Sequence, residues 1–235
     1  MADASSLPKY IQISEMLIRE IAAGHLADGA RLPPERDMAA ELGISVGTLR
    51  KALGDLSEKG MLERVQGSGN YVRHRTDVAS VYALFRLELL GGGGLPTARV
   101  LTVDRLEKEA GMRAFGPSTQ AHRIRRVRSL DDSPVAVEEI WLDGSYRETV
   151  TAQDLSDALY HFYRHALGLV IGSAVDEIGV ATVPAWADAA FDLQAGALAG
   201  YVERVSFDTR GQPAEFSRTW FDYNKARYIS RLGKG

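Results

Sequence analysis

Two arginines and one glutamate lie in neighbouring strand-like segments, 122–130 and 134–142. Side chains of a strand alternate between its two faces, so Arg126 and Arg128 share a face with apolar residues, as Glu138 does on the second segment. Charged groups on an apolar face must be paired or bind a ligand, because an unpaired buried charge is strongly unfavourable. One interpretation is a pocket for a small anion that also offers Glu138 a donor group. The other is an internal ion pair or a solvent-exposed face.

A second set of charges lies in residues 45–75, which carry a local net charge of +3. The basic residues are Arg50, Lys51, Lys59, Arg64, Arg73 and Arg75, and the acidic residues are Asp55, Glu58 and Glu63. Such a surface can face DNA phosphates, but a solvated helix face followed by a basic linker has the same composition. The elements that carry these residues must decide between the two.

Nucleophilic, metal and cofactor chemistry have little support in the sequence. The chain has no Cys, which excludes disulfides, cysteine zinc sites and thiol nucleophiles. His161 and His165 are four residues apart and could share a helix face, but no third ligand or HExxH pattern accompanies them, so a surface or packing role is favoured. No glycine-rich phosphate loop opens a helix, and no GxSxG motif is present. We therefore predict no catalytic residues, no metal and no cofactor.

The length of 235 residues suggests one large or two small domains. The formal net charge of −3 argues against a wholly basic nucleic-acid binder, but the charge is uneven. Residues 1–75 are neutral overall, whereas residues 76–235 hold eighteen basic and twenty-one acidic residues. No apolar run approaches the roughly 18 residues of a membrane span, and the first residues lack the features of a signal peptide. We expect a cytoplasmic protein without a membrane partner.

The first 72 residues predict three helices and a hairpin. Apolar residues recur at helical spacing over 8–23, a short helix is predicted over 35–42, and a third helix runs from the N-cap Ser45 to about residue 59. The tight turn LGIS makes the last two a helix-turn-helix, whose second helix can enter the DNA major groove. The strand-like segments MLERV and NYVRH, joined by QGSG, then form a hairpin of the kind called a wing.

Residues 8–72 resemble, almost end to end, the N-terminal winged helix of the GntR family of bacterial transcription regulators. The motifs RLPPERDMAAELGIS, TLRKAL and GMLERVQGSGNYV carry the resemblance. It implies DNA contacts from the Arg of LPxER, the exposed start of the recognition helix and the wing tip. The matching residues are Arg36, Ser45, Val46, Thr48, Arg50, Gly67, Ser68 and Gly69. Arg and hydroxyl side chains suit phosphate and base contacts, although a local ion pair is the alternative for Arg36.

Val46 departs from the family pattern, which usually has Arg at this position. The change removes one guanine or phosphate contact, although a valine could touch a thymine methyl group. The operator of this chain is therefore expected to differ from the one most common in the family.

Residues 73–82 read as a polar linker that divides the chain into residues 1–75 and 83–235. Strand-like segments predominate from Thr97 onward, and the turn at 131–134 predicts a β-hairpin. Helices are expected at 104–110, 153–167 and 185–191. Strand runs broken by a few helices indicate an α+β class with an antiparallel sheet rather than a doubly wound parallel sheet.

Three later segments resemble the UTRA effector-binding domain of HutC-type GntR regulators over roughly residues 80–232: RIRRVRSLDDSPVAVEEIWL, LYHFYRHALG and RVSFDTRGQPAEFSRTWFDYNKARY. That domain has a chorismate-lyase-like fold, usually dimerises and binds small, often anionic metabolites. The resemblance implies effector contacts from Phe85, Arg86, Arg126, Arg128, Glu138, Tyr160 and Glu215. Two departures stand out: Ala158 replaces the Ser of the family's SLY motif, and four glycines, 91–94, replace a more varied loop.

These resemblances imply a ligand-responsive transcription regulator, most often a repressor of a catabolic or transport operon. A homodimer would bind palindromic double-stranded operator DNA through two winged helices, because a two-fold dimer requires a two-fold site. The effector is expected to be a small anionic metabolite of the sugar phosphate or organic acid class. An enzyme of lyase-like fold acting on a small anionic substrate is the alternative, and a DNA-binding protein that responds to no effector is a third possibility.

Overall fold

The computed structural model describes residues 7–75, 82, 84–156 and 158–231. The described residues form two compact units, one made of residues up to Phe85 together with those from Ile229 onward, and one that runs from Arg86 to Tyr228. Within the predicted linker, 73–82, residues 76–81 lie outside the described residues.

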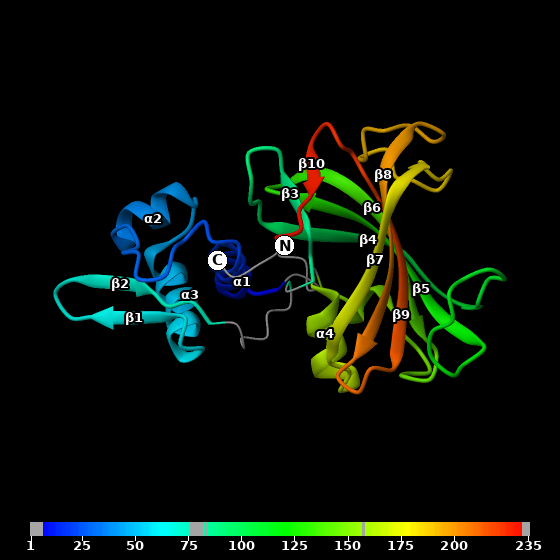
Figure 1. The fold of residues 1–235 in the computed structure, drawn as a ribbon, viewed down its shortest axis with the longest axis horizontal. Helices are drawn as coiled ribbons and strands as arrows, with labels where there is room; N and C mark the ends of the chain where they lie inside the picture. Colours follow the sequence, from blue (N-terminus) through cyan, green and yellow to red (C-terminus); the bar gives the residue numbers. More distant parts are fainter. Residues whose placement is uncertain (1–6, 76–81, 83, 157, 232–235) are drawn as a thin grey trace. The chain divides into compact units, whose positions relative to one another are not determined.

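Three helices build the first unit: α1 (Lys9–Ala22), α2 (Glu35–Glu41) and α3 (Val46–Glu58) (Figure 1). Their bounds agree with the predicted ones to within a residue at each end. The Ser45 side chain caps α3 by accepting a hydrogen bond from the Thr48 backbone N–H at 3.1 Å. Local capping signals of this kind are readable in sequence, which is why these helices could be predicted.

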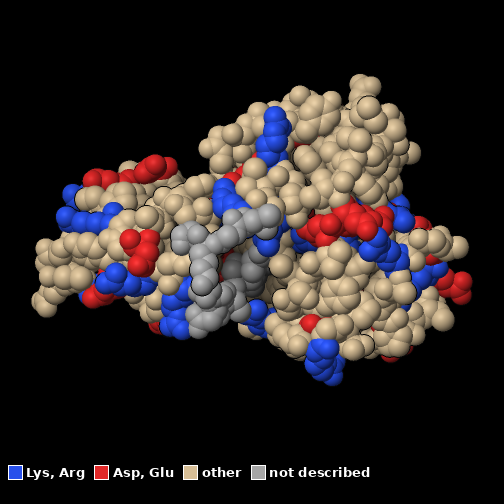
Figure 2. All heavy atoms as spheres, in the orientation of Figure 1, with Lys and Arg blue, Asp and Glu red and all other residues tan. Residues whose placement is uncertain are grey.

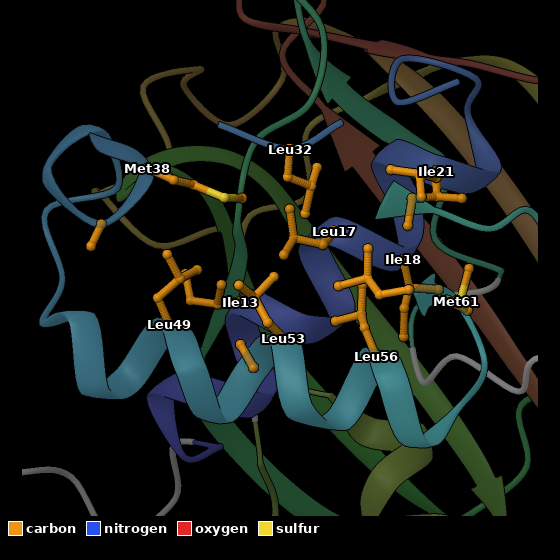
Figure 3. Close-up of a cluster of buried hydrophobic side chains, with 14 residues drawn as sticks. Ile13, Leu17, Ile18, Ile21, Leu32, Met38, Leu49, Leu53, Leu56 and Met61 are labelled. Carbon is orange, nitrogen blue, oxygen red and sulfur yellow. The ribbon is translucent and has the colours of Figure 1, made fainter. Parts of the chain in front are cut away.

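The core of this unit lies between α1 and α3. Leu49, Leu53 and Leu56 of α3 are at most 1% exposed and pack in one cluster with Ile13 and Leu17 of α1 (Figure 3). The apolar stripe that predicted each helix is therefore the stripe that becomes buried. Truncating one such leucine to alanine costs roughly 2–5 kcal/mol, so this packing holds α3 firmly on α1.

A hairpin of β1 (Leu62–Val65) and β2 (Gly69–Val72) follows α3 and forms the predicted wing. Arg31 forms a backbone bridge to Tyr71, which fixes β2 to the segment before α2. Gly67 lies in the turn between the strands with φ +75°, a conformation that would strain a residue with a side chain.

A six-stranded antiparallel sheet forms most of the second unit, with the strand order β4-β5-β6-β9-β8-β7 (Figure 1). Its strands are β4 (Pro96–Glu107), β5 (Gln120–Leu130), β6 (Ser133–Asp143), β7 (Ile171–Thr182), β8 (Leu198–Asp208) and β9 (Pro213–Phe221). A separate ribbon pairs β3 (Leu87–Leu89) with β10 (Ala226–Tyr228). The predicted α+β class with an antiparallel sheet is confirmed.

Two apolar clusters cover opposite faces of this sheet. On one face, α4 (Leu159–Leu167) packs against Ile124 and Leu142; we call this the α4 face. The other face holds a cluster around Val127 and Trp220. Because side chains alternate along β5, the arginines at 126 and 128 share the α4 face with Ile124, as the sequence predicted.

The turn between β5 and β6 contains two residues, Asp131 and Asp132, with φ of +47° and +61°. Left-handed conformations at both central positions match the hairpin turn that suits twisted strands, and Asp adopts them more readily than most residues. The predicted hairpin is confirmed. Its register sets Arg126 directly opposite Glu138.

Two of the helix predictions in this unit are wrong. Residues 104–107, expected to begin a helix, continue β4, where Asp104 forms a 2.8 Å ion pair with Arg123 of β5. The cross-strand hydrogen bonds there outweigh the weak local preference for a helix. Residues 185–191 form turns, one of which is closed by Asp188 accepting the Ala190 backbone N–H at 2.8 Å.

The predicted helix over 153–167 is too long. The segment begins with a 3₁₀ turn, η1 (Ala152–Asp154), closed by reciprocal hydrogen bonds between Thr151 and Asp154. The α-helix itself starts only at Leu159. Leu155, between the two, has an extended backbone and a buried side chain, so packing interrupts the helix there.

Candidate functional sites

The α4 face of the sheet buries the charged trio Arg126, Arg128 and Glu138. Arg126 Nε lies 2.5 Å from Glu138 Oε2, and Arg128 Nη2 lies 3.2 Å from the same oxygen. All three side chains are buried. Burial opposes ionisation of the carboxyl group, but the charges of the two arginines outweigh it and lower the pKa of Glu138 to about 2. The internal ion pair that the sequence allowed is therefore formed, and the trio carries one net positive charge.

A second buried carboxyl group, Glu215 of β9, lies among hydroxyl groups on the same face. The Tyr163 hydroxyl donates to Oε2 at 2.5 Å, and the Ser206 and Tyr160 hydroxyls lie 2.9 and 3.3 Å from Oε1. Burial raises the pKa of Glu215 despite these hydrogen bonds and the nearby charges of arginines, Arg126 among them. We call Glu215, Tyr160, Tyr163 and Ser206 the hydroxyl cluster. It adjoins the trio through Arg126.

A third group of charges links β8, β7 and β10. Arg204 Nε and Nη2 each lie 2.6 Å from one oxygen of Asp176, a bidentate pair, and the Tyr228 hydroxyl donates to Asp176 Oδ2. Burial by itself would raise the pKa of Asp176, but Arg204, Tyr228 and the more distant Arg86 together lower it below its usual value. Predicted residue Arg86 is thus close enough to act on this group.

Phe85 is the one predicted effector residue that falls in the first unit. Its ring centroid lies 5.0 Å from the guanidinium carbon of Arg19 and 6.3 Å from the ring centroid of Tyr82. Ala158 is buried immediately before α4 and caps that helix without a side-chain hydrogen bond. The hydroxyl that the family's serine would supply is therefore missing.

Several polar residues on or beside the α4 face are not among the predicted effector contacts: Tyr163, Asp176, Arg204, Ser206 and Tyr228. Two of them had a readable signal. Tyr163 follows Tyr160 by three residues and so shares its helix face. Arg204 and Ser206 alternate on one strand and so share its sheet face. Nothing local distinguishes Asp176 and Tyr228, which approach each other across 52 residues of sequence.

The start of the recognition helix α3 presents Ser45 and Arg50 to solvent. Arg50 Nε lies 2.6 Å from Glu35 Oε2 in the first turn of α2, and its side chain remains 66% exposed. The expectation that Val46 and Thr48 are also exposed is wrong, since both are half-buried. Val46 packs against the hydrophobic core because it is the one apolar side chain in the first turn of this helix.

Five exposed cations of the first unit form no ion pair with any other described residue: Lys9, Arg31, Arg36, Lys51 and Arg64. The ion pair considered for Arg36 is thus not formed within the described part of the chain. At the wing, the Ser68 and Tyr71 hydroxyls are hydrogen-bonded at 2.6 Å, while Gly67 and Gly69 are exposed. Basic and acidic side chains are interspersed on the visible face of this unit (Figure 2).

The rings of His161 and His165 lie 4.3 Å apart on α4. Among the described residues, no three His, Asp or Glu side chains are grouped so that they could hold a metal ion. None of the described helices has the length and apolar character needed to cross a membrane.

Two family models match the chain. Residues 9–72 match the model for bacterial regulatory proteins of the gntR family, and residues 92–227 match the UTRA domain. The chain belongs to the GntR family. Because its UTRA match covers more than half of the sequence, it is a GntR regulator of the HutC/UTRA type, and the predicted family is confirmed.

Curated relatives of this GntR regulator carry regulatory names. It is 58% identical to the HTH-type transcriptional regulator SmoD of Agrobacterium fabrum, over 97% of each chain. It is 30% identical, over 73% of each chain, to the mannosyl-D-glycerate transport/metabolism system repressor MngR of Escherichia coli. It is 26% identical to the repressor NagR of Bacillus subtilis, over 97% of each chain. These families and relatives are transcriptional regulators and not enzymes, so the enzyme alternative is set aside.

Solved structures of GntR regulators share its fold. The possible regulator YydK of Bacillus subtilis superposes with a TM-score of 0.52 at 22% identity, covering 97% of this chain and all of that one. The ligand-binding domain of a GntR-family regulator from Bordetella bronchiseptica gives a TM-score of 0.55 at 19% identity, covering 63% of this chain and 96% of that domain.

Proposed function

We propose that this GntR regulator is a repressor that binds a palindromic operator as a homodimer and releases it when a small anionic metabolite occupies its UTRA domain. The observation that carries the proposal is the buried trio of Arg126, Arg128 and Glu138, which lies beside the hydroxyl cluster. Buried charge is retained where it is paired or serves a ligand, and a trio in which arginines outnumber carboxylates suits an anion.

The hydroxyl cluster narrows the effector class. Glu215, Tyr160 and Ser206 offer both donors and acceptors, the chemistry that sugar hydroxyls require, while the two arginines suit a phosphate or a carboxylate. We therefore favour a phosphorylated or carboxylated sugar. The name of the relative MngR, a mannosyl-D-glycerate system repressor, supports a sugar-derived acid.

The proposed DNA-binding surface combines the start of α3, the wing tip and Arg36. Ser45 and Arg50 are exposed there, and the cations Arg36, Lys51 and Arg64 have no competing carboxylate among the described residues. Uncompensated cations on one small domain release counterions when they meet phosphates, so operator binding should weaken steeply with salt. We assign this surface to a domain of residues 1–75 and the effector site to a domain of residues 83–235.

Strand β7 is the proposed dimer contact. It is an edge strand of the sheet, and Val175, Ile178 and Val180 on it are 51%, 58% and 70% exposed. Natural edge strands are commonly protected by charge, proline or a covering element, so an apolar edge favours pairing with another strand. A second copy of the chain provides the same strand about a two-fold axis, as a palindromic operator requires.

Fluorescence anisotropy with labelled palindromes from upstream of the chain's own operon tests the proposal. The parent should bind one of them tightly, and a panel of sugar phosphates and sugar acids should contain a compound that weakens this binding. Arg125→Ala is the matched control for Arg126→Ala, because Arg125 pairs with Glu139 and stacks on Trp186 on the opposite face. A parent that binds no palindrome, or whose binding no anion changes, overturns the proposal.

A further inference from the structure

A series of polar groups runs from the hydroxyl cluster to the β3–β10 ribbon. The guanidinium of Arg204, which shares the α4 face of β8 with Ser206, lies close enough to Tyr160 to act to lower the pKa of its hydroxyl group. Arg204 in turn holds Asp176 through two 2.6 Å contacts, and Asp176 accepts the hydroxyl of Tyr228 on β10. The path therefore crosses from β9 through α4, β8 and β7 to the ribbon. The link between Tyr160 and Arg204 is electrostatic, and the other links are hydrogen bonds.

The ribbon has a special place in the chain. The sheet unit begins at Arg86, immediately before β3, and ends at Tyr228, the last residue of β10. Within the part of the chain that the structure describes, both covalent connections between the two units therefore leave from this ribbon. Beyond it, Arg231 belongs to the winged-helix unit, where its Nη2 lies 3.2 Å from His25 Nε2. A change in how firmly the ribbon is held acts on both connections at once.

Asp176 is the point at which this path can switch. Its Oδ1 accepts from Arg204, whereas its Oδ2 accepts from both Arg204 and Tyr228. Arg204 donates two N–H groups to Asp176. An effector anion near Tyr160 would attract the same guanidinium, so it would compete with Asp176 for the position of this side chain.

We propose that Arg204, Asp176 and Tyr228 form a relay that reports occupancy of the effector site to the β3–β10 ribbon. An anion that engages Arg204 draws it away from Asp176, and the Asp176–Tyr228 hydrogen bond that fastens the ribbon to β7 then weakens. Asp176 and Tyr228 are positioning residues in this scheme. The relay rests on the proposed function, because it assumes that the anion binds beside the trio and the hydroxyl cluster.

The relay makes a prediction that needs no effector. Removing the hydroxyl at the effector end, by Tyr160→Phe, and at the ribbon end, by Tyr228→Phe, should give effects that depend on each other. Hydrogen–deuterium exchange of the full chain reports them at the ribbon amides, residues 87–89 and 226–228. Tyr223→Phe is the matched control, since Tyr223 lies in the turn before β10 and is 46% exposed.

Tyr228→Phe should speed exchange of the ribbon amides about fivefold, the change expected for the loss of one ordinary hydrogen bond, and Tyr223→Phe should leave it unchanged. Tyr160→Phe should speed ribbon exchange in the parent but add nothing to Tyr228→Phe. Asp176→Asn, which preserves the size of the side chain, should reproduce Tyr228→Phe even if one tyrosine variant folds poorly.

The relay is overturned if the two tyrosine substitutions multiply each other's effects on the exchange rate of the ribbon amides. It is also overturned if these amides exchange as slowly in Tyr228→Phe as in the parent. Operator binding by the unliganded parent is measured in parallel and tests the proposed function separately. A parent that binds a palindrome while the two substitutions act independently keeps the proposed function and removes the relay. A parent that binds no palindrome removes the proposed function.

Discussion

Arg50 Nε lies 2.6 Å from Glu35 Oε2, so the arginine at the start of the recognition helix is held by a carboxylate from the preceding helix. The pair is largely solvent-exposed, and such pairs contribute only about 0–1 kcal/mol to stability. DNA can therefore displace Glu35 at small cost. Until it does, Glu35 holds the Arg50 side chain at the end of α3 that would face base edges.

Substitution of either partner should change operator binding in opposite directions. Arg50→Ala should weaken it by about tenfold or more, because a good arginine–base contact contributes roughly 1–3 kcal/mol. Glu35→Gln should strengthen it several-fold, because it removes both the competing acceptor and a negative charge near the phosphates. Fluorescence anisotropy over a salt series measures both, and a scrambled duplex shows whether discrimination is lost along with affinity. If Arg50→Ala binds the operator as well as the parent, the recognition helix is misplaced.

Low pH should lower the free energy of unfolding, because it protonates Glu138. The pKa of this carboxyl group is lowered from 4.5 to about 2 in the folded state, so its ion pairs stabilise the fold at every pH above about 4.5. That contribution, on the order of 3 kcal/mol, is lost as the pH falls from 4.5 towards 2. Urea unfolding at pH 7 and pH 3 should show this loss in the parent and a smaller one in Glu138→Gln. Equal losses in both proteins would contradict the assignment.

Glu215 should show the opposite dependence on pH. Burial raises its pKa, so the group favours the folded state most below its unfolded-state pKa, and this advantage is lost as the pH rises through the folded-state value. Glu215→Gln should therefore gain stability relative to the parent between pH 4.5 and pH 8, measured by urea unfolding. The exposed carboxylate variant Glu109→Gln is the control, and its stability should stay within about 0.5 kcal/mol of the parent at both pH values. If the stability of Glu215→Gln relative to the parent falls as the pH rises, burial does not dominate the pKa of Glu215.

The edge strand β7 should set the oligomeric state. Ile178→Lys together with Val180→Lys places two charges on the exposed apolar edge and should convert a dimer into monomers in sedimentation velocity experiments. Leu90→Lys is the matched control, because Leu90 is 55% exposed but lies outside β7. A parent that sediments as a monomer, or a double variant that remains dimeric, would exclude this contact.

The winged-helix unit could be predicted because its signals are local. Ser45 caps α3 from the adjacent position, and Leu49, Leu53 and Leu56 reveal the buried stripe by spacing alone. The hairpin that brings Arg126 and Glu138 together was likewise readable from its turn at Asp131. Their direct opposition was not, because a β-bulge next to Arg128 shifts the register by one residue from the one that a two-residue turn alone would set.

The remaining contacts depend on partners far apart in sequence. Residues 104–107 belong to a strand only because β5 offers them hydrogen-bonding partners. Arg204 meets Asp176 because β7 lies beside β8, and Tyr228 reaches Asp176 across 52 residues. Neither the strand order nor the path of the chain to β10 has a local signature, so the ion pair and the tyrosine contact could not be predicted from the sequence.

The most direct test of the account measures operator binding and effector response in one titration. The parent and Arg126→Ala/Arg128→Ala are each bound to the operator and titrated with the panel of sugar phosphates and sugar acids, with Arg125→Ala as the control. One anion should lower the operator affinity of the parent and of the control by about tenfold or more, a coupling of roughly 1.4 kcal/mol. The double variant should stay bound to the operator. Release of the double variant by the same anion at the same concentration would contradict the account.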